Sequence, residues 1–173
     1  MKIIIYIIFF LSIINFNNLT YADGKIVYLN VNYVFSNSVP GKNANKSFDK
    51  KIKTLESDVN NFKKNINDEK DKLIKKKNIL SEDIFNKEFA NIENKIKEFN
   101  KNIAIRNKEI VNLRKKVRLN FAKELKKILN DYSTQNSIQM ILKQEDILIG
   151  SKNLDISNDI LKIIDSNNIK LIE

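Results

Sequence analysis

The chain of 173 residues contains no histidine and no cysteine. These absences remove the commonest proton shuttle near neutral pH, the thiol nucleophile and the usual zinc ligands. Three glycines and one proline leave no glycine-rich loop to bind a nucleotide phosphate. Carboxylates remain, but they alternate with lysines at helical spacing, as in Asp49 and Lys53 or Glu93 and Lys97, which is typical of solvated ion pairs. We therefore predict a protein that is not an enzyme and that uses no cofactor or metal.

The dominant pattern in the sequence is two runs of apolar residues at alternating steps of three and four. The first run is Phe48, Ile52, Leu55, Val59, Phe62 and Ile66, and the second is Phe89, Ile92, Ile96, Phe99 and Ile103. Such spacing keeps a narrow apolar seam along a helix, as pairing with another helix requires. We expect two long helices, from about Ala44 to Ile79 and from Glu82 to Tyr132, and the first would be about 50 Å long.

The seam of the second helix has two irregularities. Arg106 takes a seam position between Ile103 and Ile110, where a polar residue weakens a coiled coil while specifying its register. Further on, apolar residues step four and four at Val117, Phe121 and Leu125. We expect this shift to turn the apolar face where the helix leaves its hairpin partner and enters a packed base.

Residues 1–22 have the pattern of a secretory signal. A positive start at Lys2 precedes the apolar run 3–16, and small residues stand at Thr20 and Ala22. The apolar run is short for a bilayer span and is followed at once by polar residues, so we expect cleavage after Ala22 and export to the periplasm. The alternative is an uncleaved amino-terminal anchor, which would also export the domain.

The chain is strongly basic, with 31 lysines and arginines against 21 acidic residues. Cleavage would remove Lys2 and no acid, so the formal charge of +10 would become +9. A positive field favours acidic partners such as anionic lipid, lipopolysaccharide, acidic proteins or nucleic acid. An equally weighted explanation is coding bias, because lysine, asparagine and isoleucine are abundant throughout.

Short strands are predicted at both ends of the mature chain. Lys25–Val31 combines β-branched and aromatic residues over strand length, and Asn32 can cap a short helix that carries Tyr33, Val34 and Phe35. Residues 38–41, with the only proline, are expected to break the chain before the heptads. After Asn130, the apolar runs 138–143 and 147–150 flank a polar Gln144–Asp146, which predicts a β-hairpin.

A closing helix is predicted after the hairpin. Leu154–Ser157 supplies a cap, and the apolar residues that follow share one helical face: Ile160, Leu161, Ile163 and Ile164. Three short strands with a narrow helical cover bury little apolar surface, so we expect the chain to associate with itself.

Three of these segments together resemble the Skp (OmpH-like) family of periplasmic chaperones. They are the strand Lys25–Val31, the sequence Val39-Pro40-Gly41-Lys42 before the long helix that Ala44 opens, and the closing segment Leu154–Lys162. The order of strand, short helix, helical hairpin, β-hairpin and last helix covers the whole mature chain.

The resemblance implies an α+β, mainly α fold in which a long antiparallel coiled-coil hairpin projects from a small three-stranded body that trimerises. The implied divisions are a signal peptide over 1–22, the first strand and short helix over 23–47, the hairpin over 48–130 with its tip near 75–86, and the β-hairpin and closing helix over 131–173. The implied function is ATP-independent holding of unfolded outer-membrane β-barrel proteins between the hairpins, before membrane insertion.

Candidate site residues follow from this arrangement. Lysines near the hairpin tip would contact clients, anionic lipid or lipopolysaccharide: Lys72, Lys75, Lys76, Lys77 and Lys87. The trimer body would use apolar residues of the strands: Ile26, Val27, Tyr28, Leu29, Met140, Ile141, Leu142, Ile147, Leu148 and Ile149. Asp155 and Ser157 would cap the body helix.

Two other functional classes compete with the chaperone hypothesis. A coiled-coil tether or scaffold of the cell envelope would use the same rod, with residues 3–16 as an anchor, although strands at the carboxyl end are unusual for a simple rod. Nucleic-acid binding would use Arg106, Arg114, Lys115, Lys116 and Arg118. We expect no nucleic-acid partner, because these residues lack aromatic platforms and the chain carries an export signal.

Overall fold

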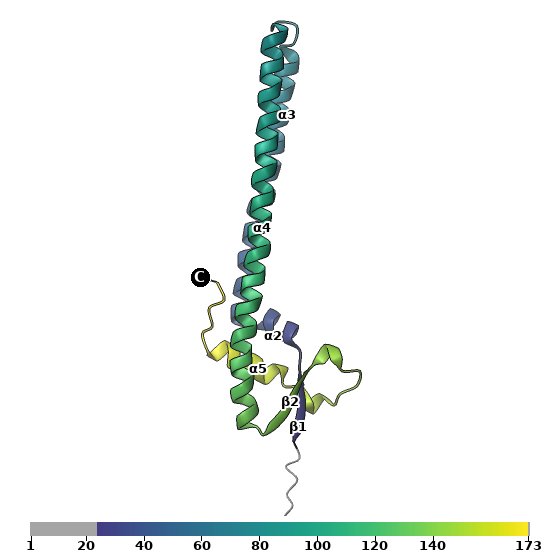
Figure 1. Cartoon of the computed structure of the whole chain (residues 1–173), viewed down its shortest axis with the longest axis vertical. Helices are drawn as coiled ribbons and strands as arrows, with labels where there is room; N and C mark the ends of the chain where they lie inside the picture. Colours follow the sequence, from purple (N-terminus) through teal and green to yellow (C-terminus); the bar gives the residue numbers. More distant parts are fainter. Residues whose placement is uncertain (1–23, 173) are drawn as a thin grey trace, which may run out of the picture.

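The computed structural model describes residues 24–172, which form a long helical hairpin on a small base (Figure 1). Helices α3, Val39–Lys75, and α4, Glu82–Gln135, make the hairpin. The base contains β1 (Lys25–Leu29), α2 (Val31–Asn37), β2 (Ile138–Lys143), the 3₁₀ helices η2 (Gln144–Asp146) and η3 (Lys152–Leu154), and α5 (Ser157–Ser166). The predicted signal, residues 1–22, lies outside the described residues. Among the helices that are described, none is both long and apolar enough to cross a membrane.

The hairpin follows the predicted seam. Leu55, Ile66 and Ile92 are buried between α3 and α4, and the rings of Phe62 and Phe99 stack with centroids 3.7 Å apart and planes 4° apart. α4 begins at Glu82 as predicted, and residues 76–81 form the turn between the helices. The interhelix contacts are therefore mostly apolar and repeat along the rod, as expected for a two-helix coiled coil.

The break predicted over residues 38–41 is confined to Ser38, because α2 ends at Asn37 and α3 already starts at Val39 and includes Pro40. Ser38 caps this helix, since its Oγ accepts a hydrogen bond from the Gly41 N–H at 3.2 Å. Proline is tolerated in the first helical turn, where its missing N–H has no intrahelical acceptor. The first long helix thus begins five residues earlier than predicted, at Val39 rather than Ala44, and ends at Lys75 rather than Ile79.

The base has a single apolar core to which every main element contributes. Fully buried side chains come from Leu29 of β1, Val34 of α2, Val117 of α4, and Ile160 and Ile164 of α5. The shift of register in α4 has the predicted consequence, because Val117, Phe121, Leu125 and Ile128 are all buried in this core. α4 therefore belongs to both the hairpin and the base.

The sheet differs from the prediction. β1 and β2 pair in parallel, with Ile26 opposite Met140 and Leu29 opposite Lys143, and they form a two-stranded sheet. The predicted second strand of the hairpin is wrong for this chain alone, since residues 147–150 form a bend and loop. Parallel pairing needs a long crossover connection, which the hairpin of α3 and α4 provides.

The amino-terminal strand is shorter than predicted because Asn30, and not Asn32, is the helix cap. Its Oδ1 accepts a hydrogen bond from the Tyr33 N–H at 2.7 Å, and α2 begins at Val31. Val31 therefore starts the helix instead of ending β1. Both asparagines suit a cap by residue type, and the fold uses the one directly after the buried strand.

Candidate functional site

The far side of α4 from the hairpin seam has an unusual composition. Exposed apolar residues and lysines alternate there at steps of three and four, the spacing of one helical face. We call this set the outer stripe: Ile105, Lys108, Val111, Lys115, Leu119, Ala122 and Lys126. Val111 and Leu119 keep 63% and 61% of their surface exposed, so neither contributes much to the packing of the chain.

The outer stripe leads into a groove between α4 and β2. The groove has a volume of about 480 Å³ and takes Ala122 and Lys126 from the stripe. The groove is also lined by Leu125, Leu129, Asn130 and Ser133 of α4, by Val31 at the start of α2, and by residues 138–141 and 143 of β2. Most of the groove lining is apolar, which gives the base an open hydrophobic surface beside its sheet.

The predicted tip lysines lie around the turn between α3 and α4. All five are exposed: Lys72, Lys75, Lys76, Lys77 and Lys87. The Lys77 Nζ stands 5.9 Å from the centroid of the Phe85 ring, a cation–π contact. Ile79 at the turn is 83% exposed, so the tip combines positive charge with a free aliphatic side chain.

The predicted body residues divide into three groups. Val27, Tyr28 and Leu29 are buried in the core of the chain itself, so they are not free for contacts with another chain. Ile26, Met140 and Leu142 are exposed on the sheet, and Ile141 and Ile147 are partly buried. Leu148 and Ile149 project into solvent.

Asp155 and Ser157 lie in a hydrogen-bond network that connects the start of α5 to the end of β1. The Ser157 Oγ donates to Asp155 Oδ1 at 2.5 Å and accepts from the Asn30 N–H at 2.9 Å. The Ile156 N–H donates to the Tyr28 carbonyl at 3.0 Å, beside β1. These bonds hold the start of α5 against the end of β1. The predicted cap differs, because the N-cap position of α5 is Ile156, which forms no side-chain cap hydrogen bond, and Ser157 is the first residue of the helix.

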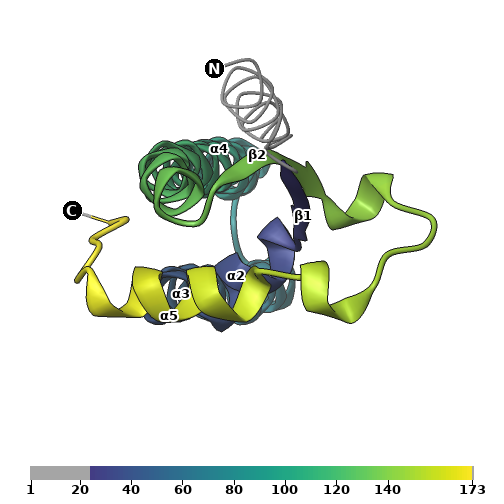
Figure 2. The ribbon, with the colours of Figure 1, turned by 90° about the horizontal axis from the view of Figure 1, so that it is seen from below.

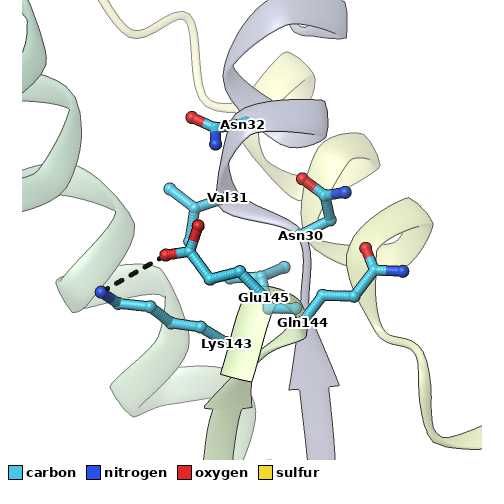
Figure 3. Close-up of a pocket in the computed structure, with 7 residues that line it drawn as sticks. Asn30, Val31, Asn32, Lys143, Gln144 and Glu145 are labelled. Carbon is cyan, nitrogen blue, oxygen red and sulfur yellow. Dashed lines mark ion pairs between the residues drawn. The ribbon is translucent and has the colours of Figure 1, made fainter. Parts of the chain in front are cut away.

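A polar cleft lies at the carboxyl ends of the two strands (Figure 3). Its volume is about 410 Å³, and Asn30, Asn32, Gln144 and the ion pair of Lys143 with Glu145 line it. The pair is loose, with 3.6 Å between Nζ and Oε1, and both side chains are well exposed. No group of three potential metal-ligating side chains occurs within residues 24–172. The cleft therefore offers exposed amides rather than a set of reactive groups.

One titratable group in the base has a perturbed pKa. Burial raises the pKa of Tyr132, and the nearby negative charge of Asp159 raises it further. The Tyr132 hydroxyl donates to Asp159 Oδ2 at 3.3 Å. This pair links α4 to α5 at the surface of the base, which is a structural role.

Sequence reasoning placed candidate residues at the tip and in the strands and missed the outer stripe. The signal was available, because the stripe repeats at helical spacing on the side opposite the seam. It was hidden by the seam itself, whose larger side chains dominate the apolar pattern of α4. Solvent exposure distinguishes the seam from the outer stripe: Val117 of the seam is buried, whereas Val111 of the outer stripe is exposed.

Comparison with known proteins identifies the family. The sequence model of the OmpH-like family, described as outer membrane protein (OmpH-like), matches residues 25–164. This span covers every element from β1 to most of α5, so the chain belongs to the OmpH-like family. No curated protein matches the sequence.

A solved structure shares the fold. It is the crystal structure of a protein from Caulobacter crescentus CB15 that is described as an outer membrane chaperone (OmpH-like). The TM-score is 0.80, and the match covers 87% of this chain and 89% of that chain at 15% sequence identity. At this identity the likeness concerns the fold, namely the long helical hairpin on a small base.

Proposed function

We propose that this protein is an ATP-independent holdase chaperone of the periplasm. It holds unfolded outer-membrane β-barrel proteins and prevents their aggregation before they reach the membrane. Membership of the OmpH-like family supports this function, as does the shared fold of a protein described as an outer membrane chaperone.

The observation that carries the proposal is the outer stripe of α4. An unfolded chain exposes apolar segments of many sequences, so a holding surface needs distributed apolar contacts rather than one fitted pocket. Ile105, Val111 and Leu119 supply such contacts over about 20 Å of helix, at 1.5 Å per residue. The lysines between them keep the surface soluble and attract acidic segments.

Assembly of three copies is part of the proposal. The bases form a shared body, and the three hairpins enclose the space in which the client is held. A small base with exposed apolar residues on its sheet supports self-association, because exposed patches of this kind are typical of protein interfaces. The signal over residues 1–22 directs export and is cleaved after Ala22.

We also propose that the tip lysines attract the chaperone to anionic surfaces. Lys72, Lys75, Lys76, Lys77 and Lys87 would attract lipid headgroups or lipopolysaccharide as well as acidic clients. Their exposure to solvent supports this role. The attraction would decline with salt, because exposed charges are screened.

The test is an aggregation assay without ATP. A urea-unfolded outer-membrane β-barrel protein is diluted into buffer with and without the chaperone, and turbidity is followed. We expect suppression at a stoichiometry near one assembly per client. Unchanged aggregation, with the protein shown to be folded by circular dichroism, would favour the envelope tether instead.

A further inference from the structure

The chain continues past α5 into a short segment that we call the carboxy-terminal tail, residues 167–172. The tail lies outside the residues that the family model matches. Asn168 has a φ of 47°, in the left-handed region that often follows a helix end and that asparagine tolerates. The tail therefore leaves the axis of α5, and Figures 1 and 2 both show it turning beside the lower part of the hairpin.

The tail covers apolar surface at the root of the hairpin. Leu171 is only 4% exposed and belongs to the core of the base, and Ile169 and Ile172 pack against that core. Lys170, between them, is exposed. Because the tail rises beside the long helices, its aliphatic side chains cover the place where the hairpin enters the base (Figure 1). The long helices contribute these residues to the same core: Ala44 and Phe48 of α3, and Val117 and Phe121 of α4.

The tail is attached mainly through its apolar side chains. Within residues 24–172, the last backbone hydrogen bond along the chain runs from the Asn167 N–H to the Ile164 carbonyl, at 3.3 Å. Beyond it, the contacts of Ile169, Leu171 and Ile172 with the core hold the tail. Burial of these side chains is similar in size to the entropy cost of ordering a short terminal segment. The tail can therefore detach while the rest of the core stays folded.

The sequence of the tail has the pattern of an extended apolar segment. Ile169 and Leu171, two residues apart, place their side chains on the same side of an extended chain, and Lys170 lies on the other side. Strands of membrane β-barrels have the same alternation of apolar and polar residues. An unfolded barrel protein thus exposes many segments with the same chemical groups as the tail, and the surface under the tail suits them equally.

We propose that the apolar surface under the tail is a binding site for extended aliphatic segments of an unfolded protein, and that the tail is an internal occupant that such segments displace. This inference rests on the proposed function and adds a second site to the outer stripe. A tethered tail competes at high local concentration, so a client that offers many segments displaces it better than a single short peptide does. When no client is present, the tail keeps the site covered and limits association between empty copies.

The experiment measures release of the tail through the reactivity of single cysteines, since the native chain has none. Leu171→Cys places a thiol at the buried position of the tail, and the matched control, Lys170→Cys, places one at the exposed position beside it. Val34→Cys, at a fully buried position of α2, reports opening of the base. Each variant of the full chain reacts with excess thiol reagent, alone and with a cysteine-free, urea-unfolded outer-membrane β-barrel protein diluted into the same buffer.

We expect the Leu171→Cys thiol of the free protein to react at least about tenfold more slowly than the Lys170→Cys thiol, which corresponds to a tail docked for about nine-tenths of the time. The unfolded protein should raise the Leu171→Cys rate to near the Lys170→Cys rate measured under the same conditions, without changing the Val34→Cys rate. A peptide with the sequence of residues 167–172, at millimolar concentration, should have the same effect. A peptide with its aliphatic residues replaced by serine should have none.

Two results would overturn the inference. Continued protection of Leu171→Cys, in a mixture where this variant suppresses aggregation of the unfolded protein, would show that the tail is a fixed part of the core and would leave the proposed function intact. Equal reactivity of the two tail thiols in the free protein would show that the tail does not occupy the surface. Failure of the unmodified protein to suppress aggregation would contradict the proposed function, and the peptide would still show whether the tail covers a binding site.

Discussion

Arg106 of α4 reaches across the helical hairpin to Asp58 of α3, with 2.7 Å between Nη1 and Oδ2. The pair lies between two apolar clusters, one in the base and one toward the tip around Ile66, Leu73 and Ile92. Both side chains remain about a third or more exposed, so the attraction between them is screened by water. The middle of the hairpin therefore holds a solvent-screened ion pair at a seam position between two apolar clusters.

Replacing this arginine by an apolar residue should stabilise the hairpin. Partly exposed ion pairs contribute about 0–1 kcal/mol, and a leucine in the seam would gain apolar burial. We expect Arg106→Leu to raise the free energy of unfolding by up to about 1–2 kcal/mol, measured by urea denaturation. Lys108→Leu, on the exposed outer stripe, is the matched control. A loss of stability in Arg106→Leu larger than in the control would show that the ion pair matters more than its exposure suggests.

The two long helices were predictable because the pattern that specifies them lies within a few neighbouring residues of the sequence. Steps of three and four placed the seam, and the shift at Val117 and Phe121 correctly indicated where α4 enters the base. Heptad patterns depend on neighbours three and four residues apart in the same helix.

The sheet and the helix ends were not predictable in the same way. Pro40 is compatible with a break and with a first helical turn, and only the cap formed by Ser38 decides between them. The segment 147–150 has strand composition but no strand beside it within the chain. Strand formation depends on a pairing partner that is distant in sequence. The composition of a segment does not reveal whether such a partner lies beside it.

The base core should depend strongly on α5. Ile160 is fully buried, so truncation leaves a cavity lined by the side chains that surround it. We expect Ile160→Ala to lower the free energy of unfolding by about 2–5 kcal/mol. The control Ile79→Ala, at an exposed position of the tip, should change it by less than about 0.5 kcal/mol. Similar small effects of both variants in thermal or urea unfolding would contradict the position of α5 in the core.

Tyr132 should contribute to a loss of stability at alkaline pH. Its pKa is raised in the folded chain above the ordinary value of 10.0, mainly by burial. The folded state therefore holds the hydroxyl proton more tightly than the unfolded state does. This contribution is complete below pH 10 and is lost as the pH rises through the folded pKa. Tyr132→Phe should flatten the decline in unfolding free energy above about pH 10, and an unchanged slope would contradict the shift.

The tip lysines should control binding to anionic membranes. Replacement of all five by glutamine should abolish salt-sensitive sedimentation with vesicles that contain anionic lipid, without changing the helical content. For the unmodified protein, about 1 M salt should have the same effect, since it shortens the screening length to about 3 Å. The control replaces five exposed lysines closer to the base: Lys42, Lys46, Lys50, Lys51 and Lys53. Equal losses in both sets would mean that total charge, and not the tip, governs binding.

The outer stripe gives the most direct test of the proposed chaperone. Val111→Asp with Leu119→Asp places two charges among the contacts that would hold a client, at positions that contribute little to folding. The control, Asn91→Asp with Asn107→Asp, adds the same charge at exposed positions of α4 outside the stripe. The measurement is turbidity of a diluted, urea-unfolded outer-membrane β-barrel protein. We predict that the control suppresses aggregation as the unmodified protein does and that the stripe variant loses most of this activity, whereas full activity of a folded stripe variant would contradict the account.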